Sequence, residues 1–143
     1  MSSPDRPNLP NPGIGGWLIV LCGLLFLVQP ISTGLVAARM LVLLPIRGVP
    51  AALVVILRLA TTGLGVAAGL ALIGLRPGAV ALTRFAVAAS AATDLIIYLS
   101  PYFPNHRAPG ETPVYVLVSL AYHLGWLAYL FRSKRVAAID GGA

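Results

Sequence analysis

Long apolar runs, separated by short segments rich in proline, glycine and charge, dominate this 143-residue sequence. A helix needs about 20 apolar residues to cross the hydrocarbon core of a bilayer. Four runs have about that length, at residues 14–36, 51–75, 79–100 and 114–131. Hydrophobic residues make up 58% of the chain and charged residues only 10%, too few to cover the surface of a soluble domain. We therefore expect an all-α membrane protein with four transmembrane helices in an up-down bundle.

Proline and glycine mark the ends of these runs. The second run lies between "PIRGVP" and "RPG", and the third ends at a proline-rich loop. The first run has no such boundary, because apolar residues continue from Ile14 to Leu44, which is too long for one straight span. Pro30 removes a backbone donor. We therefore expect the first helix to end between residues 30 and 38, followed by a short interfacial segment up to Pro45.

The basic residues predict the orientation in the membrane. With the N-terminus inside, the cytoplasmic segments carry the larger set of them: Arg6, Arg76, Arg84, Arg132, Lys134 and Arg135, against Arg39, Arg47 and Arg107 outside. Cytoplasmic loops are enriched in Lys and Arg. We therefore predict that the tails, residues 1–13 and 132–143, are both cytoplasmic, in the inner membrane of a bacterium. Trp17 and Tyr129, with Arg132, Lys134 and Arg135, are the expected anchors at the inner interface.

The chain shows few signs of chemistry. A net charge of +6 would suggest nucleic acid in a soluble protein, but here the charges lie mainly at the ends of apolar runs. We therefore expect the lipid bilayer, and not nucleic acid, as a partner. The sequence has no metal-ligand spacing, nucleophile elbow, phosphate-binding loop or haem-attachment motif, and only four acidic residues. We expect no enzyme activity, no cofactor and no metal.

Two opposite charges interrupt the apolar runs at similar depth. Asp94 lies six residues before the outer end of the third run, and Arg58 lies seven residues after the outer start of the second. At 1.5 Å per residue these depths are about 9 and 10 Å. A charge in lipid is costly and normally pairs inside the bundle. We predict an Arg58–Asp94 pair, either a structural staple or part of a proton or ion relay; alternatively, Arg58 extends outward to the interface.

His123 lies nine residues into the fourth run, near the membrane midplane. It shares a helix face with other polar and aromatic residues: Tyr115, Ser119, Tyr122, Trp126 and Tyr129. A packing stripe turned toward the bundle is the simpler interpretation of this face. Because histidine can carry protons, a proton path through His123 and Asp94 is the alternative.

Small residues are spaced for close helix contact in the two middle runs. Gly65 and Gly69 form one pair four residues apart, and Ala88 and Ala92 form another. Such pairs let helices approach closely in lipid. We expect both pairs to pack inside the bundle; a small-residue face left over after folding would instead serve a partner protein.

The two ends of the chain resemble a known family. The segment "GIGGWL" at Gly13–Leu18, Pro30 at the end of the first run, and "SKRV" at Ser133–Val136 after an aromatic-rich helix are similar to the domain of unknown function 2569 family. Its members are small bacterial four-helix membrane proteins. The resemblance implies the four-helix layout and assigns no activity. This chain differs in its short outer loop after the first run and in its final residues, "AAIDGGA".

Two hypotheses about function follow. The first is a non-catalytic accessory or scaffold subunit that packs against a larger membrane-protein complex, as the small size, the absent chemistry and the small-residue faces suggest. The second is a small transporter or channel, a homo-oligomer that uses the intramembrane residues Arg58, Asp94 and His123. Four short helices leave little room for a pore in one copy.

Overall fold

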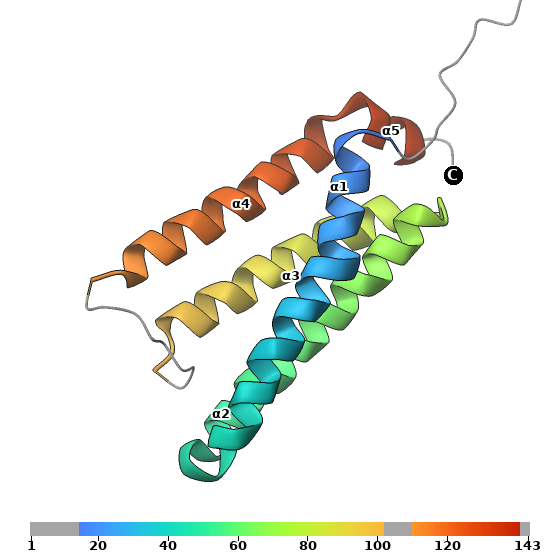
Figure 1. The fold of residues 1–143 in the computed structure, drawn as a ribbon. Helices are drawn as coiled ribbons and strands as arrows, with labels where there is room; N and C mark the ends of the chain where they lie inside the picture. The colour runs from blue at the N-terminus through green and yellow to red at the C-terminus, as the bar shows by residue number, and fades with distance from the viewer. Residues whose placement is uncertain (1–14, 102–109, 141–143) are drawn as a thin grey trace, which may run out of the picture.

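The computed structural model describes residues 15–101 and 110–140, and the secondary structure in these ranges is entirely helical (Figure 1). Its elements are α1 (Trp17–Gly23), the π-helical turn η1 (Leu24–Val28), α2 (Gln29–Ile73), α3 (Ala79–Leu99), α4 (Thr112–Arg132) and α5 (Lys134–Asp140). Within the described ranges, four segments are long and apolar enough to cross a membrane, here called the first to fourth spans: Trp17–Val42, Leu44–Ile73, Ala79–Leu99 and Thr112–Arg132. The expectation of an all-helical chain with four such helices is confirmed. The expected N-terminal tail, residues 1–13, lies outside the described residues.

Pro30 does not end the first helix. The expected end between residues 30 and 38 is wrong, because helical backbone continues through Pro30 and includes the segment that was expected to lie at the interface. The π-helical turn Leu24–Val28 lies just before the proline. Proline cannot donate to the carbonyl one turn earlier, and transmembrane helices accommodate it by local changes of this kind. The irregularity therefore widens the helix and does not break it.

The turn between the first and second spans lies inside α2, at Gly48. This residue has φ 70° and ψ −162°, a backbone conformation that residues with a Cβ avoid. After it, α2 folds back alongside its own first half (Figure 1). The hydroxyl oxygens of Thr33 and Thr62 lie 2.9 Å apart across the two halves. Gly48 thus makes a tight helical hairpin where the sequence indicated a longer connection.

The spans pack mainly on their neighbours in the chain. The first span packs on the second, α3 packs on the second span, and α4 packs on α3. Among the described residues no comparable packing joins the first span to α4, and the two helices diverge away from α5 (Figure 1). Near α5 a core closes the bundle with fully buried side chains that include Leu18, Leu21, Leu72 and Leu130. The seam between the first span and α4 therefore opens away from this core.

The two small-residue pairs differ in burial. Gly65 and Gly69 are buried against the first span: a Cβ at Gly69 would lie 3.6 Å from Cβ of Leu25. Ala88 and Ala92 are exposed, so the expectation that they pack inside the bundle is wrong. The inward face of α3 is taken by polar residues such as Asp94, and the helical rotation turns the two alanines outward.

The segment after the fourth span is a helix that packs on the bundle, although the sequence suggested a tail. Val136 and Ile139 of α5 are buried in the core that includes Leu18. Arg84 of α3 ties this helix down. Its guanidinium donates to the carbonyl of Leu130 at 3.0 Å and to the carboxylate of Asp140 at 3.4 Å. It also lies 4.5 Å from the ring centroid of Phe131. One side chain therefore joins α3, α4 and α5.

We expect Arg84→Met to release α5 and leave the four spans in place. The link to α5 is the 3.4 Å contact with Asp140, and an ion pair with this exposure contributes about 0.2–1 kcal/mol. Trypsin should therefore cleave after Lys134 and Arg135 up to about fivefold faster in the variant than in the wild type in detergent. Arg76→Met removes an exposed arginine at the same end of the bundle and serves as the control. An unchanged cleavage rate in Arg84→Met would contradict the anchoring role.

Candidate functional site

Arg58 and Asp94 form an ion pair between the second span and α3. Nη1 of Arg58 donates to Oδ1 of Asp94. The two side chains retain only 23% and 12% of their accessible surface. The pair that the depth count predicted is therefore present, and Arg58 does not extend outward to the interface. The two charges neutralise each other inside the bundle.

The ion pair continues into α4 through Ser119. The hydroxyl of Ser119 donates to the second carboxylate oxygen of Asp94 at 2.9 Å. One turn further along α4, Nδ1 of His123 lies 2.8 Å from the carbonyl oxygen of Ser119. A carbonyl oxygen only accepts, so this contact assigns the proton of a neutral imidazole to Nδ1 and leaves the lone pair on Nε2. The structure therefore brings Arg58, Asp94 and His123 together, with Ser119 as the link.

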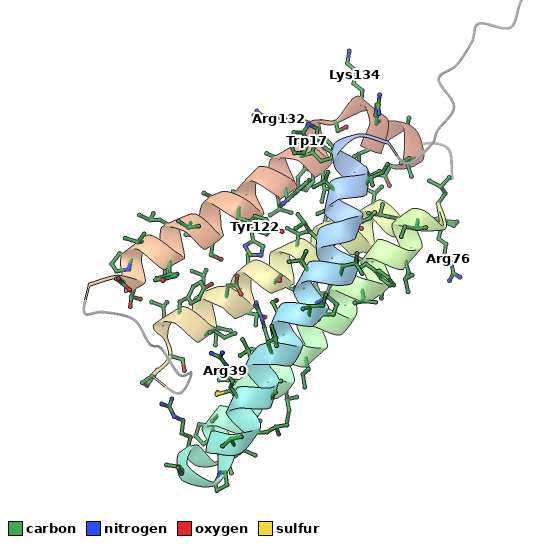
Figure 2. The ribbon with its side chains drawn as sticks, in the orientation of Figure 1. Trp17, Arg39, Arg76, Tyr122, Arg132 and Lys134 are labelled. Atoms are coloured by element: carbon green, nitrogen blue, oxygen red, sulfur yellow. The ribbon has the colours of Figure 1, made fainter. Side chains whose placement is uncertain are left out.

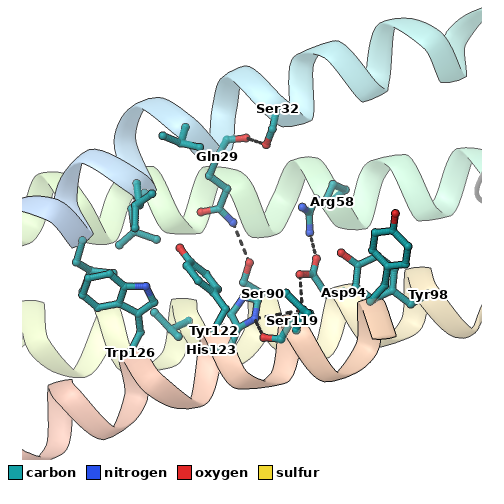
Figure 3. Close-up of a pocket in the computed structure, with 17 residues that line it drawn as sticks. Gln29, Ser32, Arg58, Ser90, Asp94, Tyr98, Ser119, Tyr122, His123 and Trp126 are labelled. Carbon is teal, nitrogen blue, oxygen red and sulfur yellow. Dashed lines mark hydrogen bonds and ion pairs between the residues drawn. The ribbon is translucent and has the colours of Figure 1, made fainter. Parts of the chain in front are cut away.

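Gln29 and Ser90 add a second polar contact that sequence analysis did not single out. Nε2 of Gln29 donates to the hydroxyl of Ser90 at 2.8 Å, which joins the first span to α3 (Figure 3). Each is a polar residue inside an apolar run, so the depth count that paired Arg58 with Asp94 could also have been applied to them. Ser90 lies one turn before Asp94 on the same helix. The polar contacts thus form a row along the inner face of α3.

These polar groups line a cleft of about 310 Å³ between the first span and α4 (Figure 3). We call it the polar cleft. Its polar floor is formed by Arg58, Ser90, Asp94, Ser119 and His123. Its aromatic wall consists of Tyr98, Tyr115, Tyr122 and Trp126, and the first span contributes Leu21, Leu24, Leu25, Val28, Gln29 and Ser32. Most of the polar and aromatic face predicted for the fourth span therefore borders a hollow and is not packed solid against the bundle.

The aromatic residues of α4 stack edge to face along the helix. The ring of Tyr122 lies 5.0 Å from the imidazole of His123, at 89°. Trp126 lies 6.4 Å from Tyr122 and 6.0 Å from Tyr129, again close to perpendicular. Such contacts are favourable for aromatic pairs and hold the rings in fixed orientations. The wall of the polar cleft is therefore built on a rigid helix face.

The predicted interface anchors gather at one end of the bundle. Trp17 at the start of α1, and Arg132 and Lys134 beside α5, lie together there (Figure 2). Arg132, Lys134 and Arg135 are exposed, and Tyr129 is half-buried. Arg39 lies toward the hairpin end of the first span (Figure 2). Among the described residues, Arg132, Lys134 and Arg135 thus lie at the end that holds α5, and the orientation in a membrane stays a prediction.

The described residues limit the chemistry of this site. Within residues 15–101 and 110–140, no three metal-ligating side chains come together. The polar cleft offers hydrogen bonds, a neutralised ion pair and an imidazole.

The fold and the site define a class, a helical membrane protein with four apolar spans and a polar cleft between the first and the fourth. No family model, no curated protein and no solved structure matches the chain. The resemblance to the domain of unknown function 2569 family therefore stays a prediction.

Proposed function

We propose that this chain is a non-catalytic accessory subunit that packs against a larger protein complex in the inner membrane of a bacterium. The observation that carries the proposal is the alanine face of α3, formed by the exposed residues Ala81, Ala88 and Ala92, with Phe85 exposed between the first two. Gly63 on the second span is exposed as well, with nothing within 4 Å of the position that a Cβ would take. The bundle does not use these small residues for its own packing.

Small residues on an outer face have a physical purpose in a membrane. Lipid gives helices no hydrophobic reason to associate, so they associate where small side chains let backbones come close. The bundle uses Gly65 and Gly69 in this way internally. The outer face of α4 also exposes small residues, Ala121, Gly125 and Ala128, beside large apolar residues such as Leu117 and Leu124. We take the alanine face of α3 as the proposed contact surface, and matched substitutions on α3 and α4 test that choice.

The distribution of charge supports the proposed orientation. Arg132, Lys134 and Arg135 lie at the α5 end of the bundle, while Arg39 and Arg47 belong to the segment that leads to the hairpin. Cytoplasmic segments carry the excess of basic residues. We therefore propose that the α5 end faces the cytoplasm.

The test is extraction of the tagged protein from its own host in mild detergent, followed by quantitative mass spectrometry. We expect a larger membrane complex in stoichiometric amount. The double variant Ala88→Leu, Ala92→Leu should reduce this complex at least tenfold, because the added side chains separate the helix backbones. The control is Ala121→Leu, Ala128→Leu, the same chemical change at exposed positions of α4. Recovery of the wild type alone or only as copies of itself would overturn the proposal.

A small homo-oligomeric transporter is the second candidate, favoured by the meeting of Arg58, Asp94 and His123 around the polar cleft. If the protein is a transporter, Asp94→Asn should abolish a pH-dependent flux in proteoliposomes while assembly persists. If it is an accessory subunit, the same change should weaken assembly, and the purified wild type should show no flux. A flux through the purified wild type would therefore decide for the transporter.

A further inference from the structure

We propose that the polar cleft binds a neutral, membrane-dissolved amphiphile, with a carbonyl-bearing ring against the polar floor and an apolar chain that leaves between the first span and α4. This binding site goes beyond the accessory role. It lies inside the bundle, whereas the alanine face of α3 lies outside.

The packing of the helices directs access to the side. At the α5 end the core that includes Leu18, Leu21 and Leu130 closes the bundle. Toward the other end, the rings of Tyr98 and Tyr115 lie 6.4 Å apart and join α3 to α4. Spans that follow one another in the chain are packed together, whereas within the described residues no comparable packing joins the first span to α4. An occupant therefore enters from the hydrocarbon region of the bilayer and must itself be soluble in lipid.

The charge of the polar floor selects a neutral head group. The positive charge of Arg58 is offset by Asp94, its ion-pair partner. A charged head would arrive without a counter-charge of its own, and an unpaired ion inside a membrane is costly. A neutral head can occupy the cleft without disturbing the pair.

The hydrogen-bonding groups of the cleft select a head that accepts hydrogen bonds. A guanidinium has five N–H donors. Among the described residues, the protein partner of the Arg58 side chain is Asp94, through Nη1. Both oxygens of Asp94 already accept hydrogen bonds, from Arg58 and from Ser119. The unused capacity of the floor is thus mainly donor capacity on Arg58, which matches carbonyl oxygens.

The shape and lining of the cleft select a ring with a chain. A volume of about 310 Å³ lies at the small end of the range of ligand pockets, about 300–1,000 Å³. Tyr122 and Trp126 of α4 point into this space opposite Gln29 of the first span (Figure 3). Aromatic side chains pack favourably on flat rings. Leu24 and Val28 line the side of the first span and offer apolar contact to the chain. A lipid-soluble quinone has all of these properties.

Fluorescence of Trp126 can report binding directly. Trp126 lines the polar cleft, whereas Trp17 is 68% exposed at the α5 end. Trp17→Phe therefore leaves one reporter in the cleft. We expect decylubiquinone to quench this fluorescence saturably in detergent-purified protein. A tenfold excess of dioctanoylglycerol or of anionic dioctanoylphosphatidylglycerol should not reverse the quenching.

Two further variants, each made in the Trp17→Phe background, separate specific binding from quenching by dissolved quinone. Val118→Phe fills part of the cleft lining and should weaken the binding at least tenfold. Leu117→Phe places the same ring at the next position, which is similarly exposed but does not line the cleft, and should leave the binding unchanged. The double variant Arg58→Met, Asp94→Met, which removes the head-group donors and keeps the floor neutral, should also weaken it at least tenfold.

Each other outcome overturns a stated part of the proposal. Equal quenching in the Val118→Phe and Leu117→Phe proteins, or none in either, would show that the cleft is not the site. Competition by dioctanoylglycerol would refute the ring, and competition by the anionic lipid would refute the neutral head. These measurements use purified protein and do not depend on a partner complex. The binding proposal and the accessory-subunit proposal can therefore fail separately.

Discussion

Asp94→Met should destabilise the folded protein by about 3–5 kcal/mol, the usual effect of removing one partner from a buried ion pair. The variant leaves the charge of Arg58 inside the bundle without its carboxylate partner, and it also removes the acceptor of the Ser119 hydroxyl. Because the Arg58 side chain keeps 23% of its surface, we expect a value at the lower end of this range. Reversible unfolding in mixed detergent micelles, followed by circular dichroism, measures the change.

Removal of both charges should restore most of the loss. In Arg58→Met, Asp94→Met no ion remains in the bundle, and replacing a whole buried pair with apolar groups is often neutral or stabilising. The double-mutant cycle should therefore give a coupling energy of at least about 2 kcal/mol, in the upper half of the range of about 0.5–3 kcal/mol that is usual for residues in contact. Arg39→Met, at an exposed arginine, should change stability by less than about 0.5 kcal/mol. Additive effects of the two single changes would refute the pair as a unit.

The ion pair could be predicted from the sequence because a membrane fixes depth. A helix rises 1.5 Å per residue, so the position of a charge within an apolar run gives its distance from the boundary. Lipid then requires opposite charges at one depth to meet, which leaves few arrangements for Arg58 and Asp94. The same reasoning constrains Gln29 and Ser90 less, because a neutral polar group is less costly to bury than a charge.

The direction of the alanine face could also have been derived from Asp94. Successive residues of a helix are about 100° apart, so Ala92 and Ala88 lie about 200° and 240° around the helix from Asp94. If the carboxylate faces inward, both alanines face outward, as the structure shows. The spacing of small residues alone indicates a contact surface, but it does not show whether that surface faces into the bundle or out of it.

Other features depend on packing that no local pattern describes. Pro30 ended the predicted helix because proline interrupts a regular helix, and the wider turn at Leu24–Val28 that accommodates it has no sequence signature of its own. The seam between the first span and α4 is similar. It follows from which helices pack together. A helix that is apolar on every side has no amphipathic face from which its packing partner could be predicted.

Gly65→Leu should destabilise the protein by about 1–3 kcal/mol through overpacking. A Cβ at this position would lie 2.6 Å from Oε1 of Gln29 and 3.5 Å from Cδ2 of Leu25. The Gln29 amide must then shift, and its 2.8 Å hydrogen bond to Ser90, a contact of about 1 kcal/mol, is the interaction most exposed to that shift. The unfolding assay in mixed micelles measures this effect as well.

The contrast with Gly63→Leu makes this prediction specific. Gly63 lies two residues earlier on the same helix, and nothing lies within 4 Å of the position of its Cβ. Both variants gain the same helix propensity and the same apolar surface, so any difference between them reports the close approach of the first and second spans. We expect Gly63→Leu to be neutral or slightly stabilising. Equal effects of the two changes would mean that the first span does not lie where the structure has it. Because that span forms one side of the seam, the polar cleft would then lose the wall that holds Gln29.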